Sequence, residues 1–427
     1  MPRSHVGPKR SNPARAHDGD PEFFLFHGDP LPWHALRMFH HGEWDSIRHP
    51  LQSVRPRERC HMRITDADVW QMATEVNHQS RNRYGGTTRL ERALVRLCDE
   101  EGHEGWGEAM PVSFTDEAIS DAVGAIKAAA ATLKGREMED PLAEIGSLAD
   151  FSGLSAARSG LEAAFLDLMS QRSGTPLADA FGGERRSEFL LDGPIGLVSP
   201  KEAIEKAGGF LAQGITTFKI KVGADPDTDA KRVLCLREEF GPDIHLRMDA
   251  NGGYTPEEAL HFAKRMEKAN IEHFEQPVLP AEERCFEIFR QIRAMGVPIA
   301  VDESLFSLDH ANRLIGEDAV DVGVIKIAKF GGPLAACEVA RAFEAAGKVC
   351  VLSSSYESFI GKAMGMTLAT SLENCARAQE LGHSAPEAEF AEWRHNLSGG
   401  TMSRTEGAGL GARGLADCLE ALSASLA

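Results

Sequence analysis

Charged side chains recur at regular intervals in the middle of the chain, each at the end of a short apolar stretch. Three are carboxylates: Asp249 in RMDANGGY, Glu275 in HFEQP and Asp302 in AVDES. One lysine precedes them and another follows, Lys221 in FKIKV and Lys326 in GVIKIAK. The intervals of 28, 26, 27 and 24 residues each match one strand–helix unit. Because the carboxyl ends of consecutive barrel strands meet at one mouth, we expect these side chains to converge there.

Carboxylates that converge in this way repel one another unless a cation lies between them. Oxygen ligands without a nearby His or Cys favour a hard ion, Mg²⁺ before Mn²⁺. Lys221 and Lys326 would approach a metal-bound substrate from opposite faces. Burial, the ion and the ammonium of Lys219 would lower the pKa of Lys221 toward that of a useful base. The alternative is a set of separate ion pairs around a barrel rim, but five consecutive strands ending in suitable residues argue against it.

The elements that carry these residues alternate between short apolar strands and helices. Strands are expected at 189–197, 217–222, 244–249, 271–275, 298–302, 322–326, 349–354 and 377–381, with helices between them. This alternation predicts an α/β fold with a (β/α) barrel. A doubly wound open sheet is less favoured because no GxGxxG follows an early strand.

The residues before the barrel predict a small α+β unit from about residue 60 to 185. An apolar strand at Arg89–Cys98 is followed by helices at Asp116–Leu133, with Thr115 as N-cap, and at Ser155–Arg172. Residues 1–58 are richer in proline and histidine, and we interpret them as an extension of unknown role.

Composition limits the class of protein. The 427 residues carry 46 Lys and Arg against 64 Asp and Glu, a net charge of −18, which argues against nucleic acid and anionic membranes as partners. No apolar run approaches the roughly 18 residues of a membrane-spanning helix. The eight cysteines form no CxxC pair and predict reduced thiols in a cytoplasmic protein.

These motifs together resemble the enolase superfamily, specifically its muconate-cycloisomerase subgroup of muconate cycloisomerases, o-succinylbenzoate synthases and dipeptide epimerases. GWGEA at 105–109 is similar to a signature of the family's capping domain, and SGLEAAFLDLMSQRSGTPLADAFGG at 159–183 to its linking helix. FKIKVG, DANGGY, FEQP, DES and IKIAKFGG match the barrel motifs in order. The resemblance implies an α+β capping domain at 59–185, a modified TIM barrel of (β/α)7β type at 186–385, and a segment at 386–427 that returns to the capping domain.

The resemblance also implies a role for each residue of the site. Asp249, Glu275 and Asp302 would bind Mg²⁺, and Lys221 and Lys326 would be the acid/base pair. The other assignments are a charge near the substrate carboxylate (Lys219), neighbours of the metal ligands (Asn251 and Glu303) and substrate contacts at the mouth (Ser355 and Glu357).

The implied reaction begins with removal of the proton alpha to a substrate carboxylate, with Mg²⁺ stabilising the enediolate. Two outcomes are favoured for the second half of the reaction. IKIAKFGGP is similar to muconate cycloisomerase, and SSSYES is similar to a serine-rich segment of some o-succinylbenzoate synthases, which are dehydratases. The alternative is a racemase or epimerase of N-acyl amino acids or dipeptides, which two opposed lysines favour. The Asp-x-Asp of dipeptide epimerases is absent from ELGHSAP, where Glu380 and His383 are the ionisable groups. Lys-x-Lys in place of Lys-x-His argues against the mandelate-racemase branch.

A loop of the capping domain is expected to select the substrate, a small carboxylate. Its counterpart should lie near Gln71–Gly86, where Arg81 and Tyr84 would contact a second anionic group; a solvated loop is the alternative. The resemblance further implies a homo-oligomer. A non-catalytic barrel scaffold is the remote alternative, and it would be expected to lack one of the ligands or lysines, all of which are present here.

Overall fold

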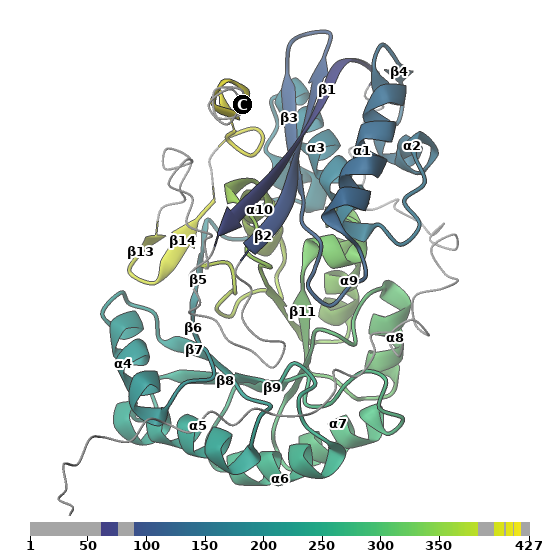
Figure 1. Cartoon of the computed structure of the whole chain (residues 1–427). Coiled ribbons are helices and arrows are strands. Elements are labelled where there is room, and N and C mark those ends of the chain that lie inside the picture. The colour runs from purple at the N-terminus through teal and green to yellow at the C-terminus, as the bar shows by residue number, and fades with distance from the viewer. Residues whose placement is uncertain (1–60, 76–88, 383–396, 405–406, 413, 420–427) are drawn as a thin grey trace, which may run out of the picture. The chain divides into compact units, whose positions relative to one another are not determined.

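The computed structural model describes residues 61–75, 89–382, 397–404, 407–412 and 414–419. Its first part contains a four-stranded antiparallel sheet in the order β3-β2-β1-β4, flanked by three helices (Figure 1). The strands are β1 (Met62–Glu75), β2 (Arg89–Asp99), β3 (Glu104–Ala109) and β4 (Glu137–Met138). The helices are α1 (Ile119–Leu133), α2 (Pro141–Leu148) and α3 (Ser155–Ser173). This is the α+β capping domain that the sequence predicts.

Helix α3 packs directly against β3, and the glycines of the GWGEA motif permit this close approach. A Cβ on Gly105 would lie 2.2 Å from the carbonyl oxygen of Ala164, and one on Gly107 would lie 1.9 Å from that of Gly160. No side chain fits at these distances, so a larger residue would push the helix away from the sheet. The motif therefore fixes the distance between α3 and the sheet.

The second part is a curled parallel sheet of seven strands in the order β12-β11-β10-β9-β8-β7-β6. Its strands are β6 (Asp192–Ile195), β7 (Thr217–Lys221), β8 (His245–Asp249), β9 (His273–Glu275), β10 (Ile299–Val301), β11 (Val322–Ile325) and β12 (Val349–Leu352). Gln379 forms a parallel bridge with Leu191 beside β6, and Glu380 forms one with Ser353 beside β12. These bridges join the two edges of the sheet, so the predicted modified TIM barrel is confirmed.

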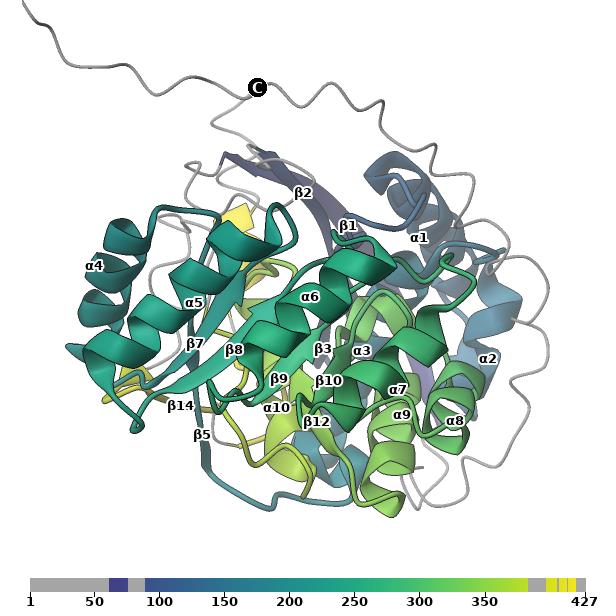
Figure 2. The same ribbon diagram turned by 90° about the horizontal axis from the view of Figure 1, so that it is seen from below.

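Helices cover the outer side of the barrel strands, and Figure 2 shows α4 to α9 in sequence around them. They are α4 (Pro200–Leu211), α5 (Pro226–Phe240), α6 (Pro256–Met266), α7 (Cys285–Ala294), α8 (Leu308–Gly316), α9 (Pro333–Ala345) and α10 (Phe359–Ser371). Proline at the first position and a capping box start both α4 and α6. One large apolar core lies between these helices and the strands, and another lies between the capping sheet and α1–α3.

Three sequence-based expectations differ from the structure. Helix α1 starts later than expected, and Thr115 is not its N-cap because the Thr115 hydroxyl donates to the carbonyl of Val112. The stretch 377–381 forms isolated bridges rather than a continuous strand, since it is the short closing edge of the barrel. Gln71–Glu75, expected in the substrate loop, form the end of β1, where each residue pairs with β2.

The described residues near the C-terminus contact both parts of the structure. Strand β14 (Thr401–Ser403) pairs with β5 (Glu188–Leu190), just before the barrel. The backbone N–H of Leu410 donates to Oδ1 of Asp167 in α3 at 2.7 Å. The domain limits at residues 58, 185 and 385 stay predictions, and the N-terminal extension lies outside the described residues. None of the helices in the described ranges has the length and apolar character of a membrane-spanning segment.

Candidate active site

The strands bring the predicted carboxylates and lysines together at the carboxyl-terminal end of the barrel. Lys221 pairs with Asp249 in the β7–β8 ladder, and Asp249 pairs with Glu275 in the β8–β9 ladder. Asp302 follows the last residue of β10, and Lys326 follows the last residue of β11. The five residues thus occupy the carboxyl ends of five adjacent strands, the edge at which barrel enzymes carry their chemistry.

Both lysines of β7 reach Asp249. The Nζ of Lys221 lies 2.5 Å from Oδ2 of Asp249 and 3.0 Å from Oδ1 of Asn251. Lys219 is more deeply buried, with its Nζ 2.7 Å from Oε2 of Glu275 and 3.2 Å from Oδ2 of Asp249. Burial lowers the pKa of Lys219, but the surrounding carboxylates raise it by more, so this lysine stays cationic.

Two lysines likewise reach Asp302 at the other end of the row. The Nζ of Lys326 lies 2.5 Å from Oδ2 of Asp302, and the Nζ of Lys329 lies 2.7 Å from Oδ1. Burial alone would raise the pKa of Asp302, but the two ammonium groups hold it below its usual range. Each of the two predicted acid/base lysines therefore stands at one end of the carboxylate row.

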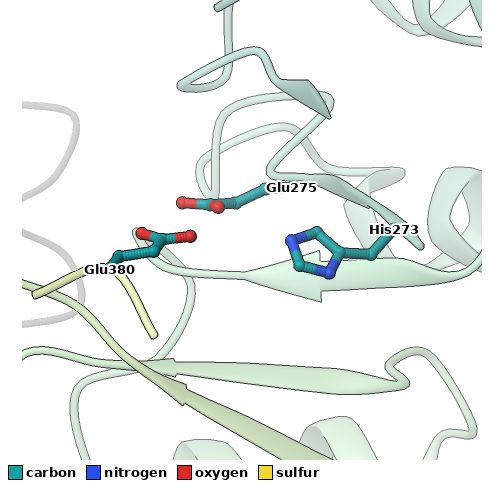
Figure 3. A group of neighbouring side chains, drawn as sticks. All are labelled: His273, Glu275 and Glu380. Carbon is teal, nitrogen blue, oxygen red and sulfur yellow. The ribbon is translucent and has the colours of Figure 1, made fainter. Parts of the chain in front are cut away.

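Glu275 also belongs to a deeper buried group with His273 and Glu380, and Figure 3 shows the three side chains together. Their ligand-type atoms lie within 4.8 Å of one another, close enough for a metal ion. However, the Nζ of Lys219 already lies 2.7 Å from Oε2 of each glutamate. Burial and the charge of Arg247 hold the pKa of His273 well below its usual range, so the ring is neutral. The place of a cation in this group is thus taken by the Lys219 ammonium.

The row of Asp249, Glu275 and Asp302 fits Mg²⁺ better. All its donors are carboxylate oxygens, the ligands that a hard ion prefers. Burial and the charge of Asp249 raise the pKa of Glu275 well above its usual range, so ionising this carboxyl is unfavourable unless a cation lies beside it. Oε1 of Glu275 accepts no hydrogen bond from the described residues, although it is buried. The residues present therefore suit a magnesium site.

Asn251 and Glu303 lie directly beside these carboxylates, where the sequence places them. The backbone N–H of Asn251 donates to Oδ1 of Asp249 at 2.9 Å, and its Nδ2 donates to Oε1 of Glu303 at 3.1 Å. Asn251 has a φ of 46°, a conformation that asparagine adopts more readily than most residues. Burial and the charge of Asp302 raise the pKa of Glu303 to about 7. The pair links the β8 end of the row to the β10 end.

In the turn after β12, Glu357, one of the two predicted substrate contacts, accepts hydrogen bonds from residues of the turn itself. Oε2 of Glu357 accepts hydrogen bonds from the Ser354 hydroxyl and the Ser355 N–H, both at 2.6 Å. Tyr356 between them has a φ of 73°, a strained conformation for a residue with a large side chain. The Ser355 hydroxyl has no hydrogen-bond partner among the described residues. Both residues stay predicted substrate contacts: the Ser355 hydroxyl is buried without a partner, and Glu357 lines a cavity next to the turn.

The capping domain anchors this turn through Glu108 of the GWGEA motif. The Glu108 carboxylate accepts from the Ser358 N–H, the Ser358 hydroxyl and the Gly361 N–H, at the N-terminus of α10, over 2.5 to 3.1 Å. A cavity beside this contact lies between the capping domain and the barrel. Its lining includes Met110, Ala163, Ala328, Ser353, Ile360 and Leu381.

Phe114 of the capping domain covers the other end of the row. Its ring centroid lies 4.9 Å from the Nζ of Lys326, and the ring packs edge to face against Phe306 at 5.8 Å. An aromatic face stabilises a nearby cation and keeps water away from it. Arg81 and Tyr84, the predicted substrate contacts of the capping loop, lie outside the described residues.

Known proteins resemble this chain in sequence and in fold. Residues 202–415, half of the chain, match the family model described as "Enolase C-terminal domain-like". The chain belongs to the enolase superfamily. It is 31% identical over 334 residues to the L-Ala-D/L-Glu epimerase of Bacillus subtilis (strain 168), which covers 76% of this chain and 90% of that protein.

Solved structures of superfamily members resemble this enolase-superfamily chain over 82% of its length. The dipeptide epimerase of Enterococcus faecalis V583, complexed with Mg and the dipeptide L-Leu-L-Tyr, is 27% identical, with a TM-score of 0.72 over 99% of that chain. The muconate lactonizing enzyme of Pseudomonas fluorescens, complexed with muconolactone, is 23% identical and shares the fold, with a TM-score of 0.73 over 96% of that chain. The predicted subgroup is confirmed, and this chain is an enzyme of the isomerase or lyase type.

Three residues of this superfamily site escaped the sequence analysis. Lys329 stands three positions after Lys326 in IKIAK, a spacing that places both at the end of one strand. Glu108 is the acidic residue of GWGEA, a motif that was used only to recognise the capping domain. Phe114 comes from an irregular segment, and no sequence pattern marks it.

Proposed function

We propose that this enzyme is a Mg²⁺-dependent racemase or epimerase of small N-acylated α-amino acids, a class that includes dipeptides. In such a substrate the reacting carbon carries the free carboxylate and one exchangeable proton. The observation that carries the proposal is the placement of Lys221 and Lys326 at opposite ends of the carboxylate row. One lysine can remove the proton from one face while the other returns a proton to the opposite face.

The residues of the site have distinct tasks in this proposal. Bound Mg²⁺ would stabilise the negative charge that develops on the substrate carboxylate, and it would be held by Asp249, Glu275 and Asp302. Lys219, fixed between two glutamates, adds a permanent positive charge beneath the row. Glu357, which lines the cavity, and Ser355 beside it would contact the substrate, and Phe114 excludes water from the lysine at the β11 end.

The relatives support epimerisation over the other outcomes. The proteins of Bacillus subtilis and Enterococcus faecalis are both named as epimerases, with dipeptide substrates in their names. This chain lacks an Asp-x-Asp in ELGHSAP; Glu380 is paired with Lys219, and His383 lies outside the described residues. A neutral acyl group therefore suits this site as well as an amino-terminal residue with a free ammonium does.

Cycloisomerisation and o-succinylbenzoate-type dehydration form the second candidate. They share the enediolate: dehydration would form it by removing the alpha proton, whereas ring closure of muconate would form it by addition of a carboxylate oxygen to the double bond and end by protonating the alpha carbon. The motif IKIAKFGGP favours this candidate.

Product analysis separates the candidates. The full chain with MgCl₂ is incubated with N-acetyl and N-succinyl amino acids, dipeptides, muconate and the succinylbenzoate precursor, followed by chiral chromatography and mass spectrometry. An epimerase yields a stereoisomer of unchanged mass from an N-acyl amino acid or dipeptide. A lactone from muconate, or loss of water from the precursor, with no stereoisomer from any amino-acid derivative, would instead establish the second candidate.

Three accompanying proposals concern the state of the enzyme. Mn²⁺ is proposed to replace Mg²⁺, since both accept carboxylate oxygens. The cytoplasm is proposed as its location, and a homo-oligomer as its assembly, with residues 1–58 contributing to subunit contacts. Light scattering of a variant that starts at residue 59 tests the last point: an unchanged assembly would contradict a contribution from these residues.

A further inference from the structure

Lys329 is the most completely buried lysine of the site, and the proposed reaction does not use it as an acid or a base. Its side chain is 0% exposed. Its Nζ donates to Oδ1 of Asp302 at 2.7 Å, to the carbonyl oxygen of Asp302 at 2.8 Å and to that of Val324 at 3.2 Å. An ammonium has three N–H donors, so these contacts use its whole capacity. The group is therefore not available to a substrate.

The three acceptors determine where the Asp302 carboxylate points. Lys329 binds both the backbone and one side-chain oxygen of Asp302, which fixes the rotation of the carboxylate. Oδ2 is left facing the Nζ of Lys326 at 2.5 Å. Asp249 is held in the same manner: the N–H of Asn251 binds its Oδ1, and its Oδ2 faces the Nζ of Lys221.

The surroundings of Lys329 hold the lysine itself in place. Its Nζ lies 5.2 to 6.0 Å from the ring centroids of Phe114, Phe306 and Phe330. The helical turn that carries it, Ile327–Phe330, ends at two glycines that contact α3 of the capping domain. There, a Cβ on Gly332 would lie 2.2 Å from the carboxylate of Glu162.

We propose that Lys329 is a positioning residue of the metal site, which ties Oδ1 of Asp302 to the protein so that only Oδ2 is presented to the ion and to Lys326. This inference rests on the proposed function, because it assigns the ion to the carboxylate row. A lysine that served only to fill the core would be replaced without cost by an apolar residue of similar volume, since burying an ammonium is itself unfavourable.

Because Lys329 is positively charged, a purely electrostatic role and a positioning role predict opposite changes in Mg²⁺ affinity when it is replaced. Removing a positive charge beside a cation site strengthens cation binding if electrostatics alone matters. Loss of positioning has the opposite effect, and changes in residues that orient metal ligands typically weaken binding about 10- to 100-fold. The direction of the change in Mg²⁺ affinity therefore separates the two roles.

The experiment is calorimetric titration of MgCl₂ into the full, EDTA-treated chain. We expect Lys329→Met to weaken Mg²⁺ binding at least about tenfold relative to wild type. The matched control is Lys348→Met, since Lys348 donates to the Val320 carbonyl at the opposite end of β11, and its affinity should equal that of wild type. Equal or tighter Mg²⁺ binding by Lys329→Met would overturn the proposal.

Lys329→Arg gives the same information if the methionine variant does not fold. It keeps the charge but replaces the three ammonium donors by a planar fork that cannot reach the same acceptors. Weaker Mg²⁺ binding by this variant supports positioning, and unchanged binding overturns it. Failure of the wild-type chain to bind Mg²⁺ would overturn the proposed function together with this inference, whereas normal wild-type binding with unaffected variants would overturn the inference alone.

Discussion

Lys221 and Lys326 lie at opposite ends of one row of carboxylates, each with its Nζ 2.5 Å from an aspartate Oδ2. Asp249, the last residue of β8, and Asp302, directly after β10, are the two partners, and Glu275 stands between them at the end of β9. A substrate held at the middle of the row would present one face to each lysine. Proton removal and proton return can then occur on opposite faces without movement of the barrel.

Glu275→Gln should abolish metal-dependent turnover while leaving the fold intact. The amide has the same size, and Lys219 keeps Asp249 and Glu380 as ion-pair partners. Loss of this charged ligand weakens Mg²⁺ binding. Because a bound metal ion contributes several kcal/mol of charge stabilisation to the transition state, turnover should fall more than about 100-fold. Activity assays and thermal unfolding check this, with the exposed Glu287→Gln as control. Wild-type turnover in Glu275→Gln would show that Glu275 is not a ligand.

Phe114→Ala should slow turnover about tenfold or more without weakening Mg²⁺ binding. The ring centroid lies nearer to the Nζ of Lys326 (4.9 Å) than to that of Lys329 (6.0 Å), and Phe306 and Phe330 still flank Lys329, so loss of the ring mainly admits water to Lys326. Phe114→Leu keeps an apolar cover and should retain more activity than the alanine variant. Parallel measurement of kcat and of Mg²⁺ affinity separates the two effects. An alanine variant as active as wild type would rule out the covering role.

Glu108→Gln should lower the free energy of unfolding by roughly 1–3 kcal/mol. A neutral amide accepts hydrogen bonds from the N-terminus of α10 less strongly than a carboxylate, and it leaves the buried Arg92 guanidinium without the carboxylate 3.8 Å from its Nε. Urea unfolding, with the exposed Glu137→Gln as control, measures the difference. Equal stability of Glu108→Gln and wild type would contradict an anchoring role between the domains.

Asp167 should make the protein less stable as the pH rises from about 4 to 7. Burial raises the pKa of this carboxyl to about 7 in the folded state, despite the hydrogen bonds from the N–H groups of Trp106 and Leu410. Its ordinary value is 3.8, so the folded chain binds the proton more tightly than the unfolded chain does. The resulting stabilisation is complete below pH 4 and is lost as the pH passes through 7, by up to about 1.4 kcal/mol per pH unit.

Unfolding of wild type and Asp167→Asn between pH 4.5 and 8 measures this contribution. The asparagine variant cannot titrate, so its stability should change less over this range than that of wild type. Identical pH profiles for the two proteins would show that Asp167 does not titrate in the range.

The barrel and the carboxylate row could be predicted because each depends on a regular pattern along the chain. Strand–helix alternation sets the fold, and charged residues at the carboxyl ends of five parallel strands must lie on the same side of the barrel. Lys329 was harder to foresee because nothing in the sequence shows that a tight turn after Lys326 folds it back onto Asp302. The rings around Lys329 include Phe114 and Phe306, which are 192 residues apart in sequence and come together only in the fold.

The substrate-facing residues were the least predictable. The motif SSSYES indicated that Ser355 and Glu357 lie at the mouth, but not that Glu357 binds the backbone of its own turn. That detail depends on the left-handed conformation of Tyr356 and on the anchoring of the turn by Glu108 across the domain contact. Gln71–Glu75 pair with β2 and so belong to β1 rather than to the predicted capping loop, and the composition of the segment does not indicate how far this pairing continues.

The central claim is that two lysines act on opposite faces of one substrate, and isotope exchange tests it most directly. Proton NMR in D₂O with MgCl₂ measures loss of the alpha-proton signal from each stereoisomer of a substrate that the wild-type enzyme converts. We expect Lys221→Ala to lose exchange of one stereoisomer and Lys326→Ala to lose exchange of the other, each by about 10²- to 10⁴-fold. Exchange of both stereoisomers at the wild-type rate in both variants would contradict the two-base mechanism.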